Sequence, residues 1–124
     1  MEHKWYIKIW TDQRYIDFWS INHTLAGCNL SALFFFVNTP FVISIFASLV
    51  VLIAWEFFEY FHGIKEVFVN RISDIVVGMI GFFLTHYLML GNVLNNTIFF
   101  AIIFLAGLIL GIWGFWAYEK IKKQ

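Results

Sequence analysis

The chain has 124 residues, of which 61% are hydrophobic and only 13% are charged, and its formal net charge at pH 7 is zero. Soluble domains average about 45–50% apolar and about 25% charged residues, so this composition and a mean hydropathy of +0.78 exclude an ordinary soluble domain and indicate an integral membrane protein. The neutral charge balance argues against a nucleic-acid partner, and the single cysteine excludes an internal disulfide. The length suits one membrane domain, residues 1–124.

The first 19 residues contain no long apolar run and are rich in aromatic side chains, namely Trp5, Tyr6, Trp10, Tyr15 and Trp19. Trp and Tyr concentrate where a membrane meets water, so we expect residues 1–19 to form an interfacial segment lying on the membrane surface. The stretch lacks the apolar core and the small-residue cleavage site of a signal peptide.

Four apolar stretches follow, each long enough to cross a bilayer as a helix that rises about 1.5 Å per residue. We expect spans at about residues 20–37, 41–61, 74–90 and 97–118. Pro40 separates the first two, because proline cannot continue a helix. The predicted fold is therefore all-α, an integral membrane bundle of four transmembrane helices with an N-terminal interfacial segment.

The basic residues indicate the orientation of this bundle. All of them lie outside the predicted spans, before the first, between the second and third, and after the fourth: Lys4, Lys8, Arg14, Lys65, Arg71, Lys120, Lys122 and Lys123. With four spans these groups share one face of the membrane. The positive-inside rule then predicts that both termini are cytoplasmic, in a bacterial inner membrane.

Ionisable residues gather at the cytoplasmic ends of three spans. Glu56 and Glu59 are three residues apart and share a helix face, Asp74 is predicted to open the third span, and His23 lies in the first turn of the first. An ionisable residue within a transmembrane segment marks a functional site by default. We therefore expect Glu56, Glu59, Asp74 and His23 to meet as catalytic acid or base groups or as metal ligands.

The chemistry open to this set is limited. Carboxylates suit Mg²⁺, Ca²⁺ or Mn²⁺, and an imidazole admits Zn²⁺ or Fe²⁺; such a divalent metal activates water against a phosphate or ester. Without a metal, clustered carboxylates can share a proton and act as general acid and base. We assign Arg71, Asn70 and Asp17 to substrate binding, with Arg71 pairing with an anionic headgroup.

Plainer interpretations stay open for each residue. Asp74, beside Ser73, can cap a helix, Glu59 and Arg71 can form an ion pair, and His23 can be a hydrogen-bonded interfacial histidine.

His86 lies about 18 Å along the helix axis from Asp74 and is interpreted as a packing histidine. A haem held by His23 and His86 is disfavoured, because the two histidines lie at different depths.

Small residues mark the faces on which the helices are expected to approach. They recur beside the polar residues of the first and third spans, at Gly27 and Ser31 and at Gly78, Gly81 and Thr85. Small residues allow close packing of membrane helices, so these faces should look inward. A further face, with Gly107, Gly111 and Gly114, is interpreted as internal packing in preference to dimerisation.

Taken in order, the polar motifs resemble a known group. They read Asp17-x-Trp19-Ser20-x-x-His23-x-x-x-Gly27, Trp55-Glu56-x-x-Glu59 and Asn70-x-x-Ser73-Asp74-x-x-x-Gly78. This ordered set resembles the VanZ-like (teicoplanin-resistance-type) family of small bacterial integral membrane proteins and allied uncharacterised families, over about residues 17–90. The resemblance implies about four helices and a cluster of buried polar residues, and no particular reaction. The short turn between the second and third spans and the N-terminal aromatic segment depart from the family pattern.

Two functions are consistent with these patterns. The first is a metal-assisted hydrolase or transferase acting on lipid or lipid-linked headgroups at a buried site on the cytoplasmic side. The alternative is a non-enzymatic accessory subunit or binding protein of a larger membrane complex or homo-oligomer, whose acids are ion-paired with basic residues. A transporter or channel is disfavoured, because we identify no polar residue deep in the outer half of the first two spans.

Overall fold

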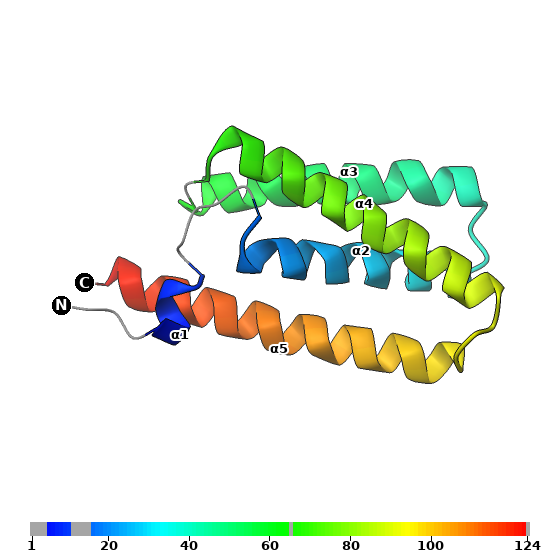
Figure 1. The fold of residues 1–124 in the computed structure, drawn as a ribbon. Helices are drawn as coiled ribbons and strands as arrows, with labels where there is room; N and C mark the ends of the chain where they lie inside the picture. Colours follow the sequence, from blue (N-terminus) through cyan, green and yellow to red (C-terminus); the bar gives the residue numbers. More distant parts are fainter. Residues whose placement is uncertain (1–4, 11–15, 65, 124) are drawn as a thin grey trace.

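The computed structural model describes residues 5–10, 16–64 and 66–123, and the regular structure within them is entirely helical. The helices are α1 (Trp5–Lys8), α2 (Phe18–Phe36), α3 (Phe41–Phe61), α4 (Phe68–Leu90) and α5 (Asn96–Lys122). Helices α2 to α5 run alternately up and down along a common axis, and α1 and the end of α5 lie at the same end as the α3–α4 turn (Figure 1). The all-α prediction is confirmed for the described residues.

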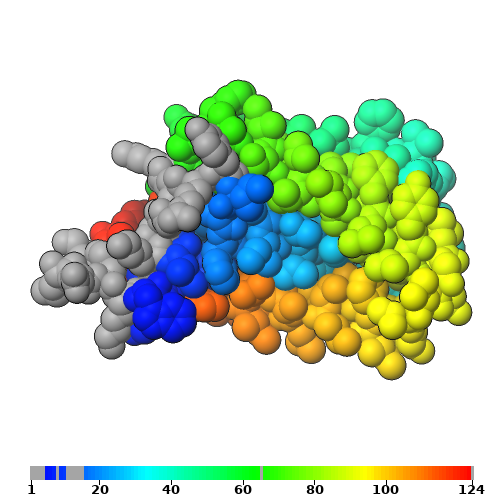
Figure 2. Space-filling view, viewed as in Figure 1, coloured from blue at the N-terminus to red at the C-terminus, as the bar shows by residue number. Residues whose placement is uncertain are grey.

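Three helices, α3, α4 and α5, are long and apolar enough to cross a membrane. Helix α2 has comparable length, with 19 residues, but its composition is more polar. It contacts each of the other three long helices, and Figure 2 shows it as a strip between α4 and α5. Because α2 meets protein on several sides, it can carry polar side chains that a lipid-facing helix would expose to hydrocarbon.

Helix α4 begins at Phe68, so the predicted start at Asp74 is wrong. The preceding residue, Val67, is the N-cap and makes no side-chain capping bond. Asp74 therefore lies within the helix and does not cap it.

The polar residues that suggested a turn at 68–73 are accommodated on the first turns of this helix. Asn70 is buried, the Arg71 guanidinium lies 4.9 Å from the centre of the Tyr60 ring, and the Ser73 hydroxyl donates to the Val69 carbonyl at 2.9 Å.

Helices α2 and α4 approach until their backbones touch. A Cβ added to Gly27 would lie 1.7 Å from the carbonyl oxygen of Gly78, and one added to Gly81 would lie 2.3 Å from the carbonyl oxygen of Thr24. This contact confirms that the predicted small-residue faces look inward. It also fixes the relative height of the two helices.

The N-terminal aromatic residues behave differently from the prediction. Trp10 and Trp19 are each only 2% exposed, and they pack together with Ala117. The indole nitrogen of Trp19 donates to the Trp10 carbonyl at 3.1 Å, and a Cβ on Gly114 would lie 2.8 Å from the Trp10 ring. The interfacial-belt prediction is therefore wrong for these two tryptophans, which belong to the core; Tyr15 lies outside the described residues.

The glycine face of α5 is used within the chain, as predicted. Gly114 lies under the Trp10 ring, and Cβ atoms added to Gly107 and Gly111 would face the side chains of Asn29 and Asn22, both on α2.

Candidate functional site

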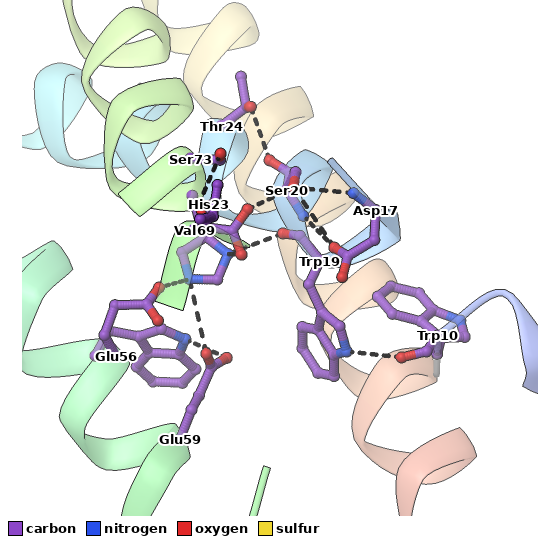
Figure 3. Close-up of polar contacts among 12 residues, drawn as sticks. Trp10, Asp17, Trp19, Ser20, His23, Thr24, Glu56, Glu59, Val69 and Ser73 are labelled. Atoms are coloured by element: carbon purple, nitrogen blue, oxygen red, sulfur yellow. Dashed lines mark hydrogen bonds and ion pairs between the residues drawn. The ribbon is translucent and has the colours of Figure 1, made fainter. Parts of the chain in front are cut away.

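His23 is the centre of the site, 2% exposed and held between α3 and α4. Its Nδ1 lies 2.9 Å from the carbonyl oxygen of Trp19, one turn earlier on α2. Its Nε2 lies 2.9 Å from Glu56 Oε1 and 3.8 Å from Glu59 Oε2 (Figure 3). The ring therefore bridges its own helix and the two carboxylates of α3.

The two glutamates of α3 are held differently. Glu59 is 2% exposed, and its Oε1 accepts a hydrogen bond from the indole nitrogen of Trp55 at 2.7 Å. Glu56 is 6% exposed, and its Oε2 has no hydrogen-bond partner among the described residues. One carboxylate is thus oriented by the protein, and the other retains free acceptor capacity.

Asp74 approaches from α4 and is fully buried. Its Oδ2 lies 3.5 Å from His23 Nδ1, and its Oδ1 accepts a hydrogen bond from the Ser20 hydroxyl. Ser20 also belongs to a capping box, in which the Asp17 carboxylate accepts from the Ser20 backbone nitrogen at 3.1 Å and the Ser20 hydroxyl accepts from the Asp17 nitrogen. The start of α2 thereby fixes both Asp74 and, one turn later, His23.

Glu66, in the α3–α4 turn, is a member of this acidic region that the sequence did not single out. Burial, and after it the negative charges of Glu59, Asp74 and Glu56, raise the pKa of Glu66 to about 8. A glutamate next to a lysine in a polar turn looks like an ordinary solvated residue, and only the folded chain shows that it is half-buried beside the other acids. Burial also raises the pKa of Asp17.

The charge balance of the site favours a cation. Among the described residues, His23 is the only ion-pair partner of Glu56, Glu59 and Asp74. Buried carboxylates are stable only when they are paired, protonated or bound to a metal. Several acids around one imidazole therefore need bound protons or a further cation.

The hydrogen bond of the His23 ring suits metal ligation. When Nδ1–H donates to the Trp19 carbonyl, Nε2 presents its lone pair toward Glu56 and Glu59, as in histidines whose second nitrogen orients them for a metal. One ligand atom from each of His23, Glu56 and Glu59 lies within 4.8 Å of the others. Metal–ligand bonds of about 2.0–2.2 Å make this spacing compatible with one ion, so the residues present fit a divalent metal.

The structure therefore brings together the four predicted central residues, His23, Glu56, Glu59 and Asp74. The alternative of a Glu59–Arg71 ion pair is wrong, because Glu59 contacts Trp55 and His23 while Arg71 lies over Tyr60.

The two described histidines outside the site, His62 and His86, are used in packing. His62 lies against Phe58, with ring centres 3.9 Å apart, and His86 stacks on Phe41 at 4.1 Å in the opposite half of the bundle.

A lateral cavity of about 440 Å³ reaches this site between α2, α3 and α5. Its lining is mostly apolar and includes His23 and Trp55 at one end, with Asn22 and Asn29 along α2. A second cavity of about 360 Å³ shares Ala26, Asn29, Trp55 and Phe104 with the first and continues along α2. An apolar passage therefore extends from the histidine along the helices.

Comparisons with protein families, with curated proteins and with solved structures find no match to this chain. The resemblance to the VanZ-like family accordingly stays a prediction, and the residues themselves carry the functional argument.

Proposed function

We propose that this protein is a small integral membrane protein that binds a divalent cation through His23, Glu56 and Glu59 and acts as a hydrolase or transferase on lipid or lipid-linked headgroups. The observation that carries the proposal is the convergence of these three buried ligands at a site where the described residues supply no Lys or Arg counter-charge. A bound divalent metal would supply a water of lowered pKa or polarise a phosphoryl or ester oxygen.

The remaining residues of the site would position these groups. The Trp19 carbonyl holds the His23 ring, and the Trp55 indole holds Glu59. Asp74, supported by Ser20, lies 3.5 Å from the other ring nitrogen and would act as the second carboxylate near the reacting group. Arg71 and Asn70, on the first turns of α4, lie at the same end of the bundle and are the candidates for contacting an anionic headgroup.

The placement of the site supports action at the cytoplasmic surface. The site lies at the end of the bundle that carries Arg71, near the start of α4, and Lys120 and Lys122, in the last turn of α5; this end is the one where the α3–α4 turn and the end of α5 meet (Figure 1). The positive-inside rule would then make that end cytoplasmic, with the site at headgroup depth in a bacterial inner membrane. We also propose that the chain is VanZ-like, and this assignment rests only on the order of its sequence motifs around Asp17, His23, Glu56 and Asp74.

The lateral cavity supports a lipid as the substrate. It is lined mainly by apolar side chains and ends at His23 and Trp55, so an apolar chain lying in it would bring an attached headgroup to the acids. A site approached this way need not open to water.

The test is elemental analysis of the detergent-purified protein after incubation with Zn²⁺, Mn²⁺ or Mg²⁺ and removal of free metal. We expect about one metal per chain in the wild type and loss of that metal in Glu56→Gln. Glu119→Gln is the matched control, because Glu119 is exposed on α5 and pairs only with Lys123 among the described residues. A wild-type protein that retains no metal, and whose melting temperature does not respond to any of the three, would refute the metal site.

An accessory-subunit function is favoured by one observation, that Glu56 Oε2 and Asp74 Oδ2 have no hydrogen-bond partner among the described residues. A basic side chain of a partner protein would satisfy them. Asp74 is fully buried, so that side chain would have to enter between the helices. Co-purification of a stoichiometric partner that is lost in Glu56→Gln would support this function over the enzymatic one.

A further inference from the structure

The buried face of α3 is polar along almost its whole length. It consists of residues spaced three or four apart, Ser44, Ser48, Leu52, Glu56 and Glu59. Side chains at this spacing share one side of a helix, and this side faces α2 and α4. The bundle is thus apolar outside and polar along the α2–α3–α4 interface, which we call the polar seam.

Two hydroxyls in the polar seam lack the partner that a membrane helix normally provides. Thr24 and Ser44 donate to carbonyls four residues earlier in the chain, at 2.8 and 3.1 Å. Ser31 and Ser48, 1% and 0% exposed, have no hydrogen-bond partner among the described residues. Buried polar groups without a protein partner are commonly satisfied by ordered water.

The polar seam reaches a cavity at the end of the bundle opposite the acids. This cavity has a volume of about 240 Å³ and is lined by Ser31, Ser44, His86, Asn38 and Thr39, together with Phe35 and Leu90. Asn38 and Thr39 belong to the α2–α3 turn, so the cavity lies at the bundle end. Because Ser31 and Ser44 belong to both cavity and seam, the two are continuous. The prediction that the outer halves of the first two spans lack polar residues is therefore wrong.

Leu52 is the one apolar member of the α3 face, and it separates the two polar halves. It is 1% exposed, and a Cβ added to Gly78 would lie 2.9 Å from its Cδ1. Ser48 lies one turn to one side of it, and Glu56 one turn to the other. Its side chain therefore fills the seam at the level where α2 and α4 touch.

We propose that water occupies the polar seam from the His86 cavity to Ser48, and that displacement of Leu52 joins it to the His23–Glu56 cluster as a proton-conducting water chain across the bundle. In each hop one O–H bond breaks as the next forms, so the row of water molecules gains and loses equal numbers of protons. The proton gradient across the membrane drives the flux. This activity requires no metal and is independent of the proposed hydrolase or transferase.

The conductance test uses the full chain in phosphatidylethanolamine–phosphatidylglycerol vesicles containing a pH-sensitive dye, with potassium and valinomycin to balance charge. Leu52→Ser should raise the proton flux at least 10-fold above that of empty vesicles, and Leu52→Phe should not. Adding Ser48→Val to Leu52→Ser should return the flux toward the baseline, whereas adding Ser73→Ala should not, since the Ser73 hydroxyl bonds its own helix. A Leu52→Ser protein that inserts and melts like the wild type but conducts no more than empty vesicles would overturn the conductance.

Water in the seam is tested separately by thiol reactivity in a Cys28→Ala background, which removes the only cysteine. Ser48→Cys should react with a small water-soluble methanethiosulfonate at least 10-fold faster than Val50→Cys, which lies on the exposed apolar face of α3. Only a hydrated thiol ionises to the reactive thiolate. Equal rates at the two positions would overturn the proposal even if Leu52→Ser failed to fold.

Discussion

Replacing Gly27 by alanine tests whether the α2–α4 contact organises the bundle. The new Cβ would lie 1.7 Å from the carbonyl oxygen of Gly78, whereas a carbon–oxygen contact needs about 3.3 Å. The helices must therefore separate by about 1.6 Å, and no side chain can move aside, because the obstacle is backbone. Overpacking costs about 1–3 kcal/mol and occasionally more; with a rigid obstacle we expect about 3 kcal/mol, well above the gain of up to about 1 kcal/mol in helix propensity.

The assay is thermal unfolding of the purified protein in detergent, followed by circular dichroism. For a chain of this size about 3 kcal/mol corresponds to a fall in melting temperature of about 10 °C. Gly107→Ala is the matched control, because its Cβ would meet the flexible Asn29 side chain at 3.4 Å and Leu25 Cβ at an ordinary 4.0 Å, and its melting temperature should hold or rise. If Gly27→Ala melted like the wild type, the close contact between α2 and α4 would be refuted.

Three further predictions concern the surroundings of the site. The pKa of Glu66 is raised from 4.5 to about 8 in the folded protein, so the folded state binds this proton more tightly than the unfolded state does. The resulting contribution to the free energy of unfolding is fully present below pH 4.5 and is lost as the pH rises through 8. In metal-free protein Glu66→Gln should therefore flatten the fall in melting temperature across that range; an unchanged slope would contradict this. Trp55→Phe removes the hydrogen bond to Glu59 and should weaken Zn²⁺ binding 10- to 100-fold in a chelator competition, so an unchanged affinity would exclude this role for the indole. Asp17→Ala removes the cap on α2 and should cost about 1 kcal/mol in chemical unfolding, whereas Asp17→Asn should cost little; equal losses would argue against capping.

Most of the helical layout could be predicted from apolar length and from turn residues such as Pro40. The start of α4 could not be predicted. The polar residues Asn70, Arg71 and Ser73 look the same in the sequence whether they form an exposed turn or the first turns of a helix packed against other helices. Asn70 is buried only because the bundle surrounds it. The burial of Trp10 could not be predicted either. Its ring fits against α5 only because Gly114, about 100 residues later in the chain, has no side chain there.

The convergence of His23, Glu56, Glu59 and Asp74 was predictable, because four ionisable residues at one depth of an apolar bundle have few places to go. The contacts that hold these four residues in place were not predictable. The Trp19 carbonyl carries no sequence signal, and Glu66 resembles any loop glutamate. Serines in transmembrane segments usually bond their own helix, so the sequence offered no reason to expect unsatisfied hydroxyls at Ser31, which was predicted only to face inward, or at Ser48.

The central position of α2 connects these observations. A helix surrounded by apolar neighbours has no water to satisfy its polar groups, so each must be satisfied within the protein or by something the protein binds. Along α2 the capping box, the Thr24 hydroxyl and the side-chain nitrogen of Asn29 are satisfied by protein atoms. Two places along α2 are not satisfied by protein atoms in this way. Around His23 the chain leaves several carboxylates, and at Ser31 it leaves a hydroxyl without a partner among the described residues. The carboxylates would be satisfied by a cation and the hydroxyl by water. Metal analysis with Glu56→Gln tests for the cation, and the thiol reactivity of Ser48→Cys tests for the water.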